Sequence, residues 1–120
     1  MSPLSSADFL TTTANAIDGY DVTQTFGIVR GIVVRSRSVF GSFGAKVQTL
    51  FGGDISLLTE MCERARADAF GNAVEHATAL GANALLAVRY DATEIMSGVS
   101  EVLCYGTAVR VAPRLRGRSD

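Results

Sequence analysis

The sequence lacks the residue patterns that most often reveal a chemical activity. It holds a single histidine and only two cysteines among its 120 residues. Cys62 and Cys104 lie in apolar segments without the close Cys/His spacing of a zinc or redox motif, so we expect buried, free thiols. No GxSxG motif is present, and a thiol in apolar surroundings has a raised pKa. Nucleophilic catalysis therefore has little support, and we expect a protein that is not an enzyme.

A block of charge of one sign is also missing. The 11 lysines and arginines are balanced by 12 aspartates and glutamates, which gives a net charge of −1. The C-terminal arginines, in residues 114–120, are the one local excess of positive charge. Because a protein that binds a nucleic-acid duplex needs clustered cations to neutralise phosphates, nucleic acid is not an expected partner.

Long apolar runs and a leader-like N-terminus are absent from the sequence. No stretch approaches the roughly 20 apolar residues of a membrane-spanning helix. The first ten residues have neither the basic start nor the apolar core of a signal peptide. Two free thiols are typical of a reducing compartment. The sequence therefore predicts a cytoplasmic protein that does not associate with a membrane.

What the sequence does contain is the composition of one folded domain. Hydrophobic residues make up 48% and charged residues 19%, and there are only two prolines. A chain of 120 residues has room for one domain. We expect a flexible arm over residues 1–9, a single domain over 10–113 and a flexible arginine-bearing tail over 114–120.

Apolar periodicity predicts an α+β fold of the order β-β-α-β-β, with an antiparallel sheet and one long helix packed on it. The last two strands are expected to form a hairpin with its turn at Ser97 and Gly98, and Ala84, Leu86 and Val88 are expected on one face. The predicted strands cover residues 9–14, 22–35, 83–93 and 101–112.

The long helix is the clearest element in the sequence. Asp54 is a suitable N-cap, and Gly81 is a suitable stop after Leu80. A shorter helix is expected over residues 39–51. Small and apolar side chains recur at steps of three and four along the long helix and form one stripe. These residues are Ile55, Leu58, Cys62, Ala65, Ala69, Ala73, Ala77 and Leu80.

Both faces of the predicted sheet are apolar. Ile28, Ile32 and Val34 oppose Val29 and Val33 along one strand. A helix is about 10 Å wide and strands lie about 4.8 Å apart, so one helix covers roughly two strands on one face. Large exposed apolar patches are rare in monomers. We therefore expect further copies of the chain to cover the second face, with the sheets closing into a ring or barrel.

Several stretches of the chain have a distinctive residue order. They are Gly52-Gly53-Asp54, residues 63–66 (ERAR), residues 80–84 (LGANA) and residues 105–109 (YGTAV). Over about residues 11–111, the chain resembles the bacterial YbjQ-like family, whose name carries a heavy-metal-binding label. The resemblance implies a dodecin-subunit-like α+β unit that assembles into a ring, most often a pentamer. It implies no catalytic residues, and no Cys- or His-rich cluster in this chain supports a metal site.

Three polar residues, Arg66, Asn72 and His76, interrupt or border the apolar stripe of the helix and are candidate ligand-binding residues. Asn72 and His76 are four residues apart and lie on one face. A buried polar side chain needs a partner, so these residues either bond across a subunit interface or line a pocket. Asp91 and Glu101 are the expected carboxylate partners of Arg66.

The candidate metal ligands are Asp91, Glu94, Glu101 and Cys104. The three carboxylates flank the predicted hairpin and would gather a hard divalent cation if several copies surround one axis; a solvated loop is the alternative. Cys104 with His76 supplies two ligands, fewer than the usual three or four.

These observations favour a non-enzymatic homo-oligomer, with a pentamer as the expected state, that binds a small ligand or a divalent metal ion. Two alternatives stay open at this point. One is an enzyme with an intersubunit site around Arg66, Asn72 and His76. The other is an assembly scaffold that acts through the tail.

Overall fold

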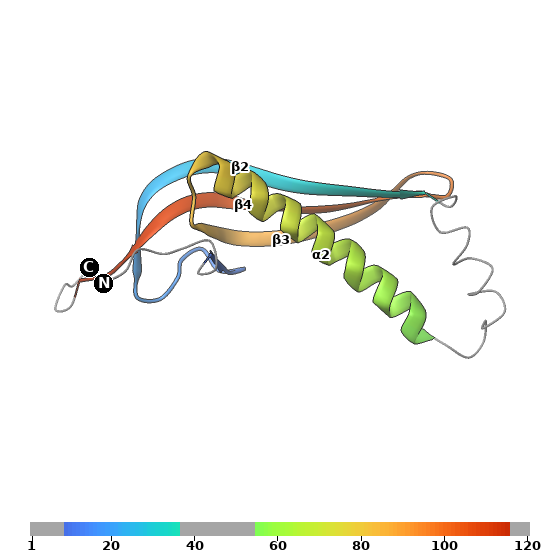
Figure 1. Cartoon of the computed structure of the whole chain (residues 1–120), viewed down its shortest axis with the longest axis horizontal. Helices are drawn as coiled ribbons and strands as arrows, with labels where there is room; N and C mark the ends of the chain where they lie inside the picture. The colour runs from blue at the N-terminus through green and yellow to red at the C-terminus, as the bar shows by residue number, and fades with distance from the viewer. Residues whose placement is uncertain (1–8, 37–54, 116–120) are drawn as a thin grey trace.

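The computed structural model describes residues 9–36 and 55–115. The chain is α+β, with one helix laid across one face of a four-stranded sheet (Figure 1). Its order agrees with the prediction, whereas Asp54 and the helix expected over residues 39–51 lie outside the described residues. The elements are β1 (Leu10–Thr11), β2 (Tyr20–Ser36), α2 (Ile55–Leu80), β3 (Ala84–Met96) and β4 (Val99–Pro113).

The expectation of a wholly antiparallel sheet is wrong. The strand order is β1-β3-β4-β2; β4 pairs antiparallel with β2 and β3, but β1 pairs parallel with β3. The two N-terminal strands therefore lie at opposite edges of the sheet. The reason is the segment between them, whose Ile17 packs with Leu10 and Tyr20 on Val109 and Val111. Because this segment covers one end of the sheet, it carries the chain from one edge to the other.

The alanines of α2 form its contact with the sheet. Ala65, Ala69, Ala73 and Ala77 are all buried, as the apolar stripe predicts. Their short side chains allow the helix backbone to come close to β2, and Gly31 lies at the point of closest approach. Cys62 and Leu80, which were also expected in this stripe, are exposed. The N-terminal part of α2, which holds Cys62, diverges from the strands (Figure 1).

The end of α2 and the start of β3 are fixed by backbone hydrogen bonds. Gly81 has φ +99°, its N–H donates to the Thr78 carbonyl, and the Ala82 N–H donates to the Ala77 carbonyl, each at 3.0 Å. This is the paired pattern of a Schellman stop, as expected for a glycine after the last helical residue. Next, the buried amide of Asn83 exchanges two hydrogen bonds with the Val111 backbone, at 2.8 and 3.0 Å.

A β-bulge in β3 changes which side chains face the helix. Leu86 pairs with Thr107 and Arg89 with Tyr105, so two residues of β3 lie opposite Gly106. Ala87 adopts φ +54° there, and its N–H donates to the Ala14 carbonyl at 2.8 Å. The predicted strict alternation is therefore wrong. Leu86 lies on the face away from α2, while Val88 packs under the helix.

The second face of the sheet is only partly covered. Val29 and Val33 are buried under α2, but Ile28, Ile32 and Val34 are 75%, 44% and 48% exposed on the opposite side. Leu103 and Tyr105 of β4 are paired with β2 on this side and are half-buried. We call the surface of Ile28, Ile32, Val34, Leu103 and Tyr105 the open face. In the part of the chain that the structure describes, one helix leaves it bare.

Within residues 9–36 and 55–115, no helix combines the length and the apolar character that crossing a membrane requires.

Candidate functional site

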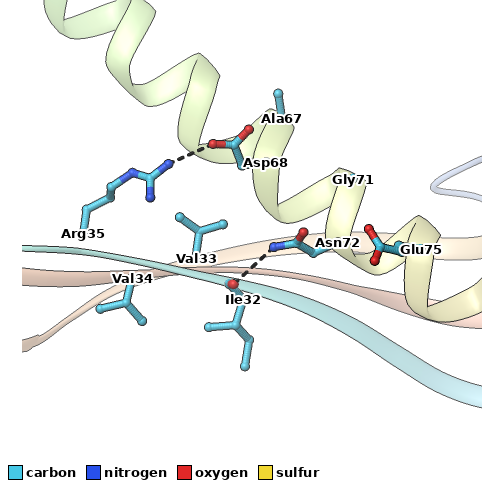
Figure 2. Close-up of a pocket in the computed structure, with 9 residues that line it drawn as sticks. All are labelled: Ile32, Val33, Val34, Arg35, Ala67, Asp68, Gly71, Asn72 and Glu75. Atoms are coloured by element: carbon cyan, nitrogen blue, oxygen red, sulfur yellow. Dashed lines mark hydrogen bonds and ion pairs between the residues drawn. The ribbon is translucent and has the colours of Figure 1, made fainter.

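A groove of about 600 Å³ runs between α2 and the edge of the sheet (Figure 2). β2 contributes residues 32–35 to its floor, and the exposed side of α2 contributes Ala67, Asp68, Gly71, Asn72 and Glu75. β2 is an edge strand, since only β4 pairs with it among the described strands. The groove therefore lies alongside a row of backbone groups that a further strand could bond.

Three polar side chains of α2, at steps of four residues, reach across to β2. Asp68 forms an ion pair with Arg35 at 2.8 Å, and the Asn72 amide donates to the Ile32 carbonyl at 3.5 Å (Figure 2). His76 Nδ1 lies 3.5 Å from the Arg30 backbone nitrogen and 3.4 Å from its oxygen, so its tautomer decides whether it accepts or donates. The structure thus places Asn72 and His76 side by side over the backbone of β2, as their spacing predicts, and Asn72 also lines the groove.

Arg66 does not join these two residues. At 100° per residue it lies about 120° around the helix from Asn72, and its charge acts instead on the Tyr90 hydroxyl. Its expected partners are also placed differently. Asp91 pairs with Leu103, and Glu101 pairs with Thr93 and Val34. Both carboxylates therefore lie on the side of the open face, away from α2.

The four candidate metal ligands are divided between different surroundings. Cys104 is buried under α2, whereas Asp91 and Glu101 lie on the opposite side of the sheet. Glu94 accepts a hydrogen bond from the Gly98 N–H at 3.2 Å and so stabilises the hairpin turn. Among residues 9–36 and 55–115, no three His, Cys, Asp or Glu side chains cluster closely enough to hold a metal ion. The described residues of one chain do not fit a metal site.

Tyr90 of β3 and Cys104 of β4 are paired residues on the α2 side of the sheet, and their side chains are hydrogen-bonded to each other. Burial raises the pKa of the Cys104 thiol, although the hydrogen bond with Tyr90 acts in the opposite direction. Burial also raises the pKa of Tyr90, with a further contribution from Cys104, while Arg66 lowers it. A protonated, buried thiol is a poor nucleophile and a poor metal ligand. Cys104 is therefore suited to packing in the core.

The raised pKa of Cys104 predicts a loss of stability at alkaline pH. The folded state binds the thiol proton more tightly than the unfolded state, so its contribution is complete below the ordinary value of 9.0 and is lost as the pH rises through the folded pKa. Urea unfolding at a series of pH values should show a smaller alkaline loss for Cys104→Ala than for the native chain. Cys62→Ser, at an exposed thiol, is the matched control and should keep the native slope. Equal slopes in all three proteins would contradict this assignment.

Sequence reasoning missed the roles of Asp68, Arg35 and Glu75. Asp68 and Glu75 lie on the side of α2 away from the apolar stripe, and both are exposed, but they also line the groove. The step of four from Asp68 to Asn72 to His76 was the available signal. The pairing of Asp68 with Arg35 depends on the position of β2 beneath the helix, which helix periodicity alone does not give.

Known relatives share nearly the whole described domain. Residues 9–112 match the YbjQ family, which carries the description "Putative heavy-metal-binding". UPF0145 proteins of Burkholderia thailandensis and Burkholderia mallei are each 60% identical to the chain over 101 residues, which cover 84% of this chain and 91% of each relative. The resemblance seen in the sequence is confirmed over this length, and the chain belongs to the YbjQ family of UPF0145 proteins.

Proposed function

We propose that the chain works in the cytoplasm as a non-enzymatic homo-oligomer, a ring of five copies, that binds a small ligand or a divalent metal ion between its copies. The observation that carries this proposal is the open face. Its three β2 side chains, Ile28, Ile32 and Val34, are 75%, 44% and 48% exposed. Fully burying an exposed aliphatic side chain stabilises by about 1.5–3 kcal/mol, so covering this surface with a second copy is favourable. The number five follows from the family resemblance.

The position of the polar residues supports a site between copies. The described part of one chain holds no group of three metal-ligating side chains. Asp91 and Glu101 are diagonal neighbours beside the open face, because Asp91 pairs with Leu103 and Glu101 pairs with Thr93. A rotation axis near this face would repeat the pair once per copy. Carboxylates gathered in this way bind hard cations such as Mg²⁺ or Ca²⁺.

An enzyme built around Arg66, Asn72 and His76 has less support. Asn72 and His76 contact the backbone of β2, whereas Arg66 lies on another side of α2 near Tyr90. Cys104 is buried, and its raised pKa opposes thiolate chemistry. These contacts favour structural roles for the three residues. The binding function is therefore the one that we propose.

Elemental analysis combined with native mass spectrometry of the untreated protein tests the ligand. We expect an assembly of 12.7 kDa chains that carries a metal ion or a small molecule in a fixed ratio to the copies. Glu101→Gln should release a metal without changing the assembly. If the assembly carries no ligand, and takes up none when divalent cations are added, the binding part of the proposal fails.

A further inference from the structure

The sheet ends in two edges that can pair with further strands. β2 forms one edge, because β4 alone pairs with it among the described strands. The other edge is shared by β1 and β3. β1 pairs with Ala84 and Leu85, and the segment after it bonds β3 as far as Val88. Beyond that residue, the outer side of β3 from Arg89 to Met96 has no strand beside it in the described part of the chain. Unpaired edges of this kind favour addition of another strand.

The two edges have compatible directions. Both β2 and β3 run antiparallel to β4, so they run parallel to each other. If the β3 of a second copy lies beside β2, the same contact can repeat from copy to copy with every strand keeping its direction. Such a head-to-tail contact closes into a ring when the rotation is right. It would also place the open face of every copy on the same side of the continued sheet.

The side chains that now cover the edge of β2 make only long contacts with it. Asn72 bonds the Ile32 carbonyl, and His76 reaches the Arg30 backbone, at 3.4–3.5 Å. Backbone hydrogen bonds between paired strands are normally near 2.9–3.0 Å. These contacts also show that the N–H and C=O groups of Arg30 and Ile32 point outward from the sheet. A docked strand would replace them with shorter bonds.

Charge selects the register of the contact. Within one chain, Arg30 of β2 and Arg89 of β3 lie at the same position along the sheet, because both pair with Tyr105. A contact between copies without a stagger would therefore place Arg30 beside Arg89 of the partner subunit. A stagger of two residues instead places Arg30 beside Asp91 of the partner subunit, and closed barrels require a stagger between strands. The same stagger brings the partner subunit's Glu94 to the groove, diagonal to Arg35.

We infer that the free edge of β2 receives the outer edge of β3 from a second copy, in parallel, with Arg30 beside Asp91 of the partner subunit. This inference rests on the proposed homo-oligomer and specifies how its copies join. The groove beside β2 is then completed by the partner. Asp68 and Glu75 of one chain would share it with the partner subunit's Glu94, which is a carboxylate set that no single chain provides.

Disulfide cross-linking between two differently tagged chains tests the contact. Ile32→Cys in one chain and Thr93→Cys in the other, both with Cys62→Ser, are co-expressed and then oxidised. In the inferred register these residues lie beside each other, about 4.8 Å apart, which suits a disulfide. Each chain carries only one of the two new cysteines, so a bridge between them within one chain cannot form. We expect a product of twice the chain mass that carries both tags and disappears on reduction.

Gln24→Cys paired with Thr93→Cys is the matched control, since Gln24 is exposed on the same strand but far from the contact, and it should give no such product. In the cross-linking pair, Arg30→Asp or Asp91→Arg alone should reduce the yield, and the two together should restore it. An assembly of full mass without the Ile32–Thr93 bridge would overturn this inference and leave the proposed homo-oligomer intact. A lone chain in solution would overturn both.

Discussion

Replacing Gly31 by alanine is expected to force α2 away from the sheet. A Cβ atom at this position would lie 2.8 Å from the Asn72 Cβ and closer still to the backbone oxygen of Ala69 and the backbone nitrogen of Ala73. Helix backbone cannot move aside without pulling the buried alanines out of the core. Overpacking in a core costs about 1–3 kcal/mol and sometimes more. For Gly31→Ala we expect a loss at the upper end, about 3 kcal/mol, measured by urea unfolding.

Gly71→Ala provides the matched control for Gly31→Ala. Gly71 lies on the exposed side of the same helix, and a Cβ there would meet no atom within 4 Å. Alanine is favoured over glycine inside a helix by about 0.8–1 kcal/mol, so this variant should be slightly more stable than the native chain. A Gly31→Ala protein as stable as Gly71→Ala would show that α2 does not approach β2 closely.

Placing a charge on the open face is expected to dissociate the assembly. Ile28 is 75% exposed in the single chain, so Ile28→Glu should leave the fold of each copy intact. In the assembly the same residue would be buried, and an unpaired carboxylate is costly away from water. Losing one buried isoleucine alone removes about 1.5–3 kcal/mol, which corresponds to roughly a 10- to 100-fold weaker association. Analytical ultracentrifugation over a dilution series measures the change.

Gln24→Glu adds the same charge to the same strand at a position that is already polar and exposed. It should assemble like the native chain, with an unchanged circular dichroism spectrum. If Ile28→Glu also assembles normally, the open face is not buried in the assembly. If it unfolds instead, the single chain depends on Ile28 in a way that its exposure does not explain.

Much of the architecture follows from local patterns in the sequence. The step of four between Ala65, Ala69, Ala73 and Ala77 predicts the buried side of α2, and Gly81 predicts its end. Apolar residues alternate between the two faces of β2, and one helix can cover only one of these faces. The burial of Val29 and the exposure of Ile28 agree with this prediction. These features depend on contacts within one element or on one residue type, so periodicity is enough to reveal them.

Two features of the sheet depend on contacts between distant segments. The bulge at Ala87 is supported by the Ala14 carbonyl, more than 70 positions earlier in the chain, and alanine gives no local sign of a positive φ. The parallel pairing of β1 depends on Ile17 and Leu10 packing on β4. Neither contact has a periodic signature. Sequence reasoning therefore assumed plain alternation and a wholly antiparallel sheet.

Only part of the candidate site could be predicted from the sequence. The spacing of Asn72 and His76 places them together, and both contact the backbone of β2. The grouping of Arg66 with them fails because it lies about 120° away around the helix. The partners expected for Arg66 could not be judged from sequence, because the side of the sheet that Asp91 occupies depends on the bulge earlier in β3.

Static light scattering during size-exclusion chromatography, in dilute buffer at neutral pH, tests the central claim most directly. That claim is that one helix and one short N-terminal segment do not cover the open face of the sheet, so copies of the chain must do so. We predict a single peak whose mass is a multiple of 12.7 kDa, with five copies expected. A stable, monodisperse peak at 12.7 kDa would contradict the account.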